Sequence, residues 1–223
     1  MRIALAFDIY GTLIDPHGVV DELAQHVGER AQEFSGIWRD KQLEYTFRRG
    51  LMGRYENFVV CTRQALDYTD SLLHTDLDES AKTALMQIYR VLPAYPDVPA
   101  SLQALADAGF RMFGFSNGVA DAVSGLLEHA GIDQYFEGVV SVDTLRTFKP
   151  SPDVYRHFID VAATDAEHCW LVSSNGFDVI GAVSAGMKAA WLQRSSAVVF
   201  DPWGIDATLV VHSLSELSEK INT

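Results

Sequence analysis

The sequence has little cysteine and no pattern that would pair it. Of the 223 residues only Cys61 and Cys169 are cysteines, one inside a helical pattern and the other at the start of an expected strand. We therefore expect no disulfide scaffold, and a reducing, cytoplasmic setting fits this usage best. The apolar residues 170–172 follow Cys169, which favours a packed thiol over a reactive one.

The sequence is also short of positive charge and of long hydrophobic runs. Lysine and arginine total 17 against 30 aspartates and glutamates, a formal net charge of -13. Because such a field repels phosphate backbones, we expect no nucleic-acid partner. No apolar run approaches the roughly 18 residues of a membrane span, and the run at 3–7 is too short for a signal peptide. We therefore expect a globular protein without membrane association.

Apolar runs of strand length are present, and helical patterns separate most of them. The runs cover residues 3–7, 111–115, 138–142, 169–173 and 188–192, and helical spacing appears at 119–131 and 151–163. This alternation predicts an α/β fold, a doubly wound, Rossmann-like parallel sheet with helices on both faces. In such folds ligands bind beyond the carboxyl ends of the strands.

Residues 16–93 interrupt the alternation, since they contain helical stretches and no convincing strand. The stretches lie at 19–28, 37–51, 57–69 and 79–92, and prolines at 93, 96 and 99 favour a hinge after them. We predict a helical cap domain at 16–93, inserted into a catalytic core made of residues 1–15 and 94–223.

Polar residues follow four of the expected strands. Asp8 ends the first, and a carboxylate in a sheet-end crevice can act as a covalent nucleophile or simply cap a turn. Ser116 and Asn117 end the second and suggest an anion-binding corner or an ordinary helix cap. Lys149 directly precedes two closely spaced prolines, Pro150 and Pro152, which favours a positioned side chain over a solvated loop residue. Asp178 lies in the first turn of a helix, where the helix dipole favours a carboxylate.

Taken together, the order Asp8, Ser116–Asn117, Lys149, Asp178 resembles the haloacid dehalogenase superfamily over nearly the whole chain. Most of that superfamily are phosphatases with a second acid in the first motif, D-x-D, and magnesium-binding acids in the last. Here Tyr10 and Ser174 stand at two of those acid positions. A halide leaves without protonation, whereas an alkoxide needs a general acid and phosphoryl transfer needs a metal. The missing acids are those that carbon–halogen cleavage does not need.

The first motif is similar to F-D-x-Y-G-T-L of the L-2-haloacid dehalogenases (type II). The resemblance extends to Arg39, at the place of an arginine that binds the departing halide and helps to hold the substrate carboxylate. A solvated helix arginine is the alternative. The family often has tryptophan where this chain has Phe177, which suggests a pocket of different size.

The resemblance implies a complete set of site residues. Asp8 would be the nucleophile, Thr12, Ser173 and Asn175 would position the ester or water, and Lys149 would orient Asp8. Either Asp178 or Lys149 would activate water. The predicted catalytic residues are Asp8, Thr12, Arg39, Lys149, Ser173, Asn175 and Asp178, and the predicted substrate-binding residues are Tyr10, Arg39, Leu43, Phe58, Ser116, Asn117, Tyr155 and Phe177. For Leu43 and Phe58, simple packing within the cap is the alternative.

The implied reaction converts an L-2-haloalkanoate to a D-2-hydroxy acid through an ester on Asp8, with no cofactor and no metal. The partner would be this small-molecule substrate, and the family suggests a homodimer. Two other functions stay open: a magnesium-dependent small-molecule phosphatase of the same superfamily, and a non-catalytic relative that binds a ligand.

Overall fold

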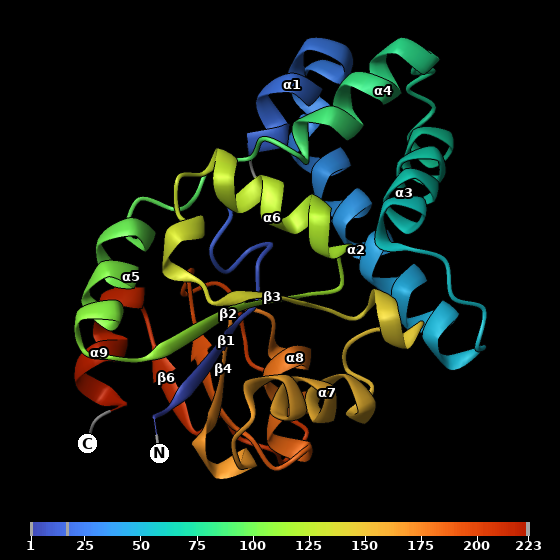
Figure 1. The fold of residues 1–223 in the computed structure, drawn as a ribbon. Helices are drawn as coiled ribbons and strands as arrows, with labels where there is room; N and C mark the ends of the chain where they lie inside the picture. Colours follow the sequence, from blue (N-terminus) through green and yellow to red (C-terminus); the bar gives the residue numbers. More distant parts are fainter. Residues whose placement is uncertain (1, 17, 222–223) are drawn as a thin grey trace.

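The computed structural model describes residues 2–16 and 18–221, so residues 1, 17, 222 and 223 of the predicted domains lie outside the described part. The fold is a six-stranded parallel sheet with the order β3-β2-β1-β4-β5-β6 (Figure 1). The strands are β1 (Ala4–Phe7), β2 (Arg111–Ser116), β3 (Gly138–Ser141), β4 (Cys169–Ser173), β5 (Lys188–Leu192) and β6 (Leu209–Val211). The predicted doubly wound α/β class is confirmed, and the strand order reverses between β1 and β4.

Side chains that alternate along the strands bury the two faces of the sheet against different helices. On β1, Leu5 and Phe7 face the core shared with α5 (Val98–Asp107), α6 (Ala120–His129) and α9 (Leu217–Lys220). Ala4 and Ala6 face the core shared with α7 (Pro152–Ala162) and α8 (Gly176–Ser184). All four side chains are completely buried. Strands covered on both faces are expected to read as continuous apolar runs, as these do.

Four helices follow β1 without an intervening strand among the described residues. They are α1 (Gly18–Val27), α2 (Ala31–Leu51), α3 (Phe58–Leu73) and α4 (Glu79–Ile88), and they gather at one end of the sheet (Figure 1). Asn57 and Asp78 cap α3 and α4 by accepting hydrogen bonds from main-chain amides. These helices fall inside the predicted insertion, but its boundaries at 15/16 and 93/94 stay a prediction.

The structure corrects three details of the sequence prediction. The sequence did not predict β6, which has only three residues and so carries little pattern, nor did it predict α5. Pro99 belongs to the first turn of α5, where the missing amide hydrogen is not needed, so the proposed hinge is shorter. Within the described residues no helix is long and apolar enough to cross a membrane.

Candidate active site

The sheet order brings the predicted residues together at its carboxyl edge. β1 pairs with β2 on one side and with β4 on the other, so Phe7 lies beside both Gly114 and Val172. Asp8 follows β1, Ser116 ends β2 and Ser173 ends β4, and these three residues therefore meet at the point where the strand order reverses.

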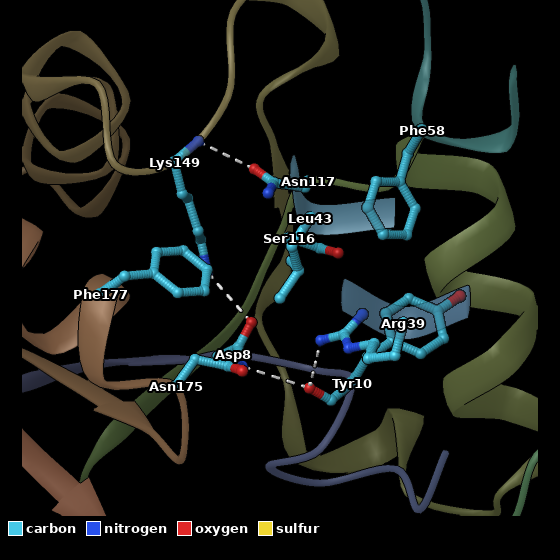
Figure 2. Close-up of a pocket in the computed structure, with 10 residues that line it drawn as sticks. All are labelled: Asp8, Tyr10, Arg39, Leu43, Phe58, Ser116, Asn117, Lys149, Asn175 and Phe177. Atoms are coloured by element: carbon cyan, nitrogen blue, oxygen red, sulfur yellow. Dashed lines mark hydrogen bonds and ion pairs between the residues drawn. The ribbon is translucent and has the colours of Figure 1, made fainter. Parts of the chain in front are cut away.

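The two oxygens of the Asp8 carboxylate have different surroundings. Oδ2 accepts hydrogen bonds from Thr12 Oγ1 at 2.9 Å, Ser173 Oγ at 3.1 Å and Asn175 Nδ2 at 2.7 Å. Oδ1 accepts only from Lys149 Nζ, at 3.2 Å, among the described residues (Figure 2). Since a carboxylate oxygen has two lone pairs, Oδ1 keeps capacity for a further bond.

Asp8 stays ionised although it is nearly buried. Burial by itself would raise its pKa, but the charges of Lys149 and Arg39 and the hydrogen bonds from Thr12 and Asn175 hold the pKa of this carboxyl below its usual value. An ionised carboxylate with one lightly bonded oxygen has the properties of a nucleophile.

Lys149 is 1% exposed and uses all three ammonium hydrogens. Its Nζ donates to Asp8 Oδ1, to the Phe115 carbonyl at 2.8 Å and to Asp178 Oδ2 at 2.7 Å. Burial would lower the pKa of Lys149, but the carboxylates of Asp178 and Asp8 raise it above its ordinary value. The lysine therefore stays protonated and does not suit the role of a base.

Asp178 and Tyr155 lie behind the pocket rather than in its wall. Both are completely buried, and the Tyr155 hydroxyl donates to Asp178 Oδ1 at 2.7 Å. Burial raises the pKa of Asp178 to about 6 despite the nearby Lys149. The structure thus places Tyr155 near the lysine, as expected, but not among the pocket-lining residues where a substrate-binding role would put it.

The pocket beside Asp8 is small and has a polar and an apolar side. Its volume is about 20 Å³, slightly more than one water molecule needs. The rings of Tyr10 and Phe58 stack at 6.0 Å, and Phe177 packs edge-on against Phe47 at 5.0 Å. The pocket is lined by Asp8, Tyr10, Arg39, Leu43, Phe58, Ser116, Asn117, Lys149, Asn175 and Phe177 (Figure 2). Leu43 and Phe58, for which simple cap packing was the alternative, therefore reach the site.

Arg39 reaches the pocket from α2. Its Nη1 donates to Gln42 Oε1 at 2.6 Å and its Nη2 lies 3.4 Å from the Tyr10 carbonyl (Figure 2). Gln42 is completely buried and donates in turn to Thr62 Oγ1 at 2.6 Å. Sequence reasoning missed Gln42. The sequence signal for Gln42 was its spacing. Gln42 and Thr46 follow Phe34 and Trp38 at intervals of four residues, which places these two polar side chains on the same buried face of α2.

Ser116 and Asn117 line the pocket, but the helix expected to begin there starts later, at Ala120. The Gly118 amide is not free, since it donates to Ser116 Oγ at 3.0 Å. Asn117 Oδ1 accepts from the Lys149 amide at 2.9 Å, which leaves its side-chain amide hydrogens for a ligand. The corner can therefore hold a carboxylate through side-chain donors.

The donor set does not suit a magnesium ion. The Tyr10 carbonyl, the main-chain oxygen that could ligate one, lies 3.4 Å from both Arg39 Nη2 and Asn175 Nδ2. Ser174, a hydroxyl, stands where the first metal-binding acid of the last motif was expected, and the described residues contain no group of three His, Cys, Asp or Glu side chains that could hold a metal ion. Because Mg²⁺ prefers carboxylate and carbonyl oxygens, a site faced by a guanidinium is unfavourable for it.

Comparisons with known proteins show the family of the chain. A family model for haloacid dehalogenase-like hydrolases matches residues 4–186. Haloacetate dehalogenase H-2 of Moraxella sp. (strain B) is 37% identical over 191 residues, 86% of this chain and 85% of the relative. The (S)-2-haloacid dehalogenase of Pseudomonas sp. (strain YL) is 36% identical over 219 residues, 98% of this chain and 94% of the relative.

A solved structure matches over the whole fold. It is the L-2-haloacid dehalogenase from Xanthobacter autotrophicus with chloropropionic acid covalently bound, which is 34% identical with a TM-score of 0.91 and covers 100% of this chain and 99% of its own. The sequence and the fold both match this group. The chain therefore belongs to the haloacid dehalogenase-like hydrolases, in the family of the (S)-2-haloacid dehalogenases.

Proposed function

We propose that the protein hydrolyses L-2-haloalkanoic acids to D-2-hydroxy acids through an ester on Asp8. The observation that carries this proposal is the uneven Asp8 carboxylate, whose Oδ2 is held by three donors while Oδ1 keeps a lone pair beside the pocket. The names of the relatives and the covalently bound chloropropionic acid in the Xanthobacter enzyme support it.

In the first step Asp8 Oδ1 attacks carbon 2 of the substrate from the side opposite the halogen. The carbon–halogen bond breaks, the configuration inverts and the halide leaves toward Arg39. The Ser116 hydroxyl and the Asn117 amide hold the substrate carboxylate, and the apolar walls made by Tyr10, Leu43, Phe58 and Phe177 surround its alkyl group. A fixed geometry of this kind lowers the entropic part of the barrier.

In the second step water attacks Cγ of the Asp8 ester, and the product leaves with Oδ1 as its new hydroxyl oxygen. Because Asp178 does not line the pocket and Lys149 is protonated at rest, we assign the role of final proton acceptor to Asp178: Lys149 Nζ passes a proton to Asp178 Oδ2 and takes one from water in its place. The proton taken from water returns to the departing alkoxide, and Asp8 then ionises. Each turnover releases one halide and one proton.

A halide leaving group explains why the protein needs no acid at the positions of Tyr10 and Ser174. A halide needs no proton as it leaves, so Tyr10 can form an apolar wall in place of a general acid. Displacement at an alkyl carbon transfers no dianionic phosphoryl group, so Ser174 can replace a metal ligand. We therefore propose a metal-independent reaction.

The size of the pocket favours short substrates. The space beside Asp8, about 20 Å³, holds little more than one water molecule, so the pocket must open to admit a substrate and the shortest haloacids need the least opening. Chloroacetate and L-2-chloropropionate are thus the first substrates to test.

The deciding experiment measures halide and phosphate release in parallel. The protein is incubated with L-2-chloropropionate, its D-enantiomer and a chromogenic phosphate ester, each with EDTA or with magnesium. We expect halide release from the L-enantiomer that EDTA does not change, and none with Asp8→Asn. Magnesium-dependent phosphate release without halide would instead support the phosphatase, and neither product would support the ligand-binding relative.

The covalent step has its own test, a single turnover in heavy-oxygen water with enzyme in excess. We expect the label in the Asp8 carboxylate and not in the product. Label that enters the product directly would contradict the ester. The homodimer and the cytoplasmic location stay predictions, and light scattering after gel filtration tests the first.

A further inference from the structure

Two residues at the carboxyl end of β5 hold the loops that carry the site. The Trp191 indole donates to the Ser174 carbonyl at 3.2 Å. Arg194 donates twice to the Thr12 carbonyl, from Nε at 3.1 Å and from Nη2 at 2.6 Å. Neither residue lines the pocket, so both act on it through Thr12 and Ser174.

Thr12 and Ser174 are bonded to each other and to the nucleophilic carboxylate. The Ser174 amide donates to Thr12 Oγ1 at 2.9 Å, and Thr12 Oγ1 donates to Asp8 Oδ2 at 2.9 Å. Because the hydroxyl accepts the amide hydrogen with one lone pair, its own proton is directed at Asp8. The orientation of this hydroxyl therefore depends on where the two loops are held.

Arg194 is itself fixed on three sides. Its Nη1 pairs with Asp97 Oδ1 at 2.8 Å, and its guanidinium carbon lies 4.0 Å from the centre of the Tyr95 ring. Its side chain is only 16% exposed. Asp97 Oδ2 accepts from the Leu214 amide at 3.0 Å, which anchors the pair to the segment after β6.

Arg194 also joins both chain segments that connect the sheet to the helices α1–α4. The outgoing segment carries Thr12, the returning one carries Asp97, and Ile14 and Ala94 form an antiparallel bridge between them. The Tyr95 amide donates to the Leu13 carbonyl at 2.9 Å beside this bridge. The planar guanidinium of Arg194 has several donors in a fixed geometry and can bind both segments at once, whereas a lysine ammonium cannot.

We propose that Arg194 is a positioning residue for the nucleophile: it fixes the Thr12 carbonyl, so that the Thr12 hydroxyl points its proton at Asp8 Oδ2 and leaves Oδ1 to attack. Trp191 plays the matching part for Ser174. The effect of these two residues on turnover rests on the proposed function.

The main test is Arg194→Lys, which keeps the charge and loses the fork. We expect kcat for L-2-chloropropionate to fall about 10- to 100-fold, since small displacements at a reacting centre have such effects, while KM changes less than about threefold because the substrate contacts remain. Trp191→Phe, which keeps a ring and removes the donor, should lower kcat less.

The chain offers a matched control in Arg111. It also binds a carboxylate, Glu137, and a main-chain carbonyl, that of Ala162, and it lies over the Phe113 ring, but it stands at the start of β2, away from the site. Arg111→Lys should lower the melting temperature without changing kcat. An equal loss of kcat in both variants would reduce Arg194 to a general stabilising residue and overturn the proposal.

A double-mutant cycle separates positioning from other effects. If Arg194 acts through the Thr12 hydroxyl, Arg194→Lys should cost much less in a Thr12→Ala background than in the wild type. Fully additive losses, or unchanged kcat in Arg194→Lys, would overturn the proposal. These outcomes are distinct from failure of the proposed function, in which the wild type itself would release no halide.

If the wild type releases no halide, the positioning role can still be tested by a measurement that does not depend on activity. Hydrogen exchange of the Ser174 and Tyr95 amides should be faster in Arg194→Lys than in wild type and unchanged in Arg111→Lys, since both amides bond within the clamped segments. Unchanged exchange in Arg194→Lys would overturn the positioning role whatever the substrate.

Discussion

The Nζ of Lys149 lies 2.7 Å from Oδ2 of Asp178, and neither side chain is more than 1% exposed. The pair sits directly behind the Asp8 carboxylate, which Lys149 also contacts. A base with a pKa close to the working pH is most effective, and burial brings the pKa of Asp178 to about 6. The pair can therefore keep Asp8 ionised and later accept a proton.

Removing the base should stop the reaction at the ester. Asp178→Asn keeps the size of the side chain and an oxygen for Lys149, but it cannot take the proton from water. We expect one equivalent of halide and then no turnover, with the substrate's 1-carboxyalkyl group attached to Asp8 as an ester. Intact-protein and peptide mass spectrometry would detect this adduct, and continued turnover would contradict the assignment.

The pH dependence should separate the two steps. Asp178 is ionised above its pKa of about 6, so kcat should fall as the pH drops below that value, approaching about tenfold per pH unit. The pKa of Asp8 is below its ordinary value, so the first equivalent of halide should still appear at pH 5 in a rapid-quench experiment. Loss of both steps at the same pH would contradict this division.

Tyr155 provides a check on the same titration. The hydrogen bond from its hydroxyl lowers the pKa of Asp178, so Tyr155→Phe should move the acid limb of kcat to higher pH. The pH–rate profile measures the shift. An unmoved limb would mean that a group other than Asp178 titrates.

Phe177 should set the accepted chain length. Phe177→Ala opens the pocket on the side of Phe47, and we expect the ratio of kcat/KM for L-2-chlorobutyrate over L-2-chloropropionate to rise about tenfold, the usual effect of one methylene group in an apolar pocket. Phe177→Trp should shift the ratio the other way. Phe47→Ala is the control, with a smaller effect because Phe47 packs against the Phe177 ring but does not line the pocket.

Restoring the two acids should weaken dehalogenation. In Tyr10→Asp with Ser174→Asp, two further carboxylates beside Asp8 repel the anionic substrate and disfavour the ionised nucleophile. We expect kcat/KM for L-2-chloropropionate to fall more than about 100-fold, because a like charge next to a bound carboxylate costs several kcal/mol.

The neutral pair Tyr10→Asn with Ser174→Asn, which matches the acids in size, should retain more activity. If the acidic pair dehalogenated as well as the neutral one, the leaving-group explanation of Tyr10 would be wrong.

The sequence by itself determined the class of the fold and the edge of the sheet at which the polar residues after the strands meet. Apolar runs that alternate with helical periods required a parallel sheet, and in such a sheet Asp8 and Ser173 must end at one edge. The presence of Tyr10 in place of a second acid was visible in a single motif. These inferences succeed because they depend on local pattern and on the fixed direction of parallel strands.

Tertiary structure alone decided which side chains face the substrate and which support those that do. Tyr155 and Asp178 lie behind Lys149, while Leu43 and Phe58 reach the pocket from separate helices. Gln42 bonds to Thr62 and Arg194 bonds to Thr12, and both contacts join distant parts of the chain that are brought together by the packing of helices and sheet. The hydrophobic periodicity of one element does not predict such contacts, because they depend on which other elements pack against it.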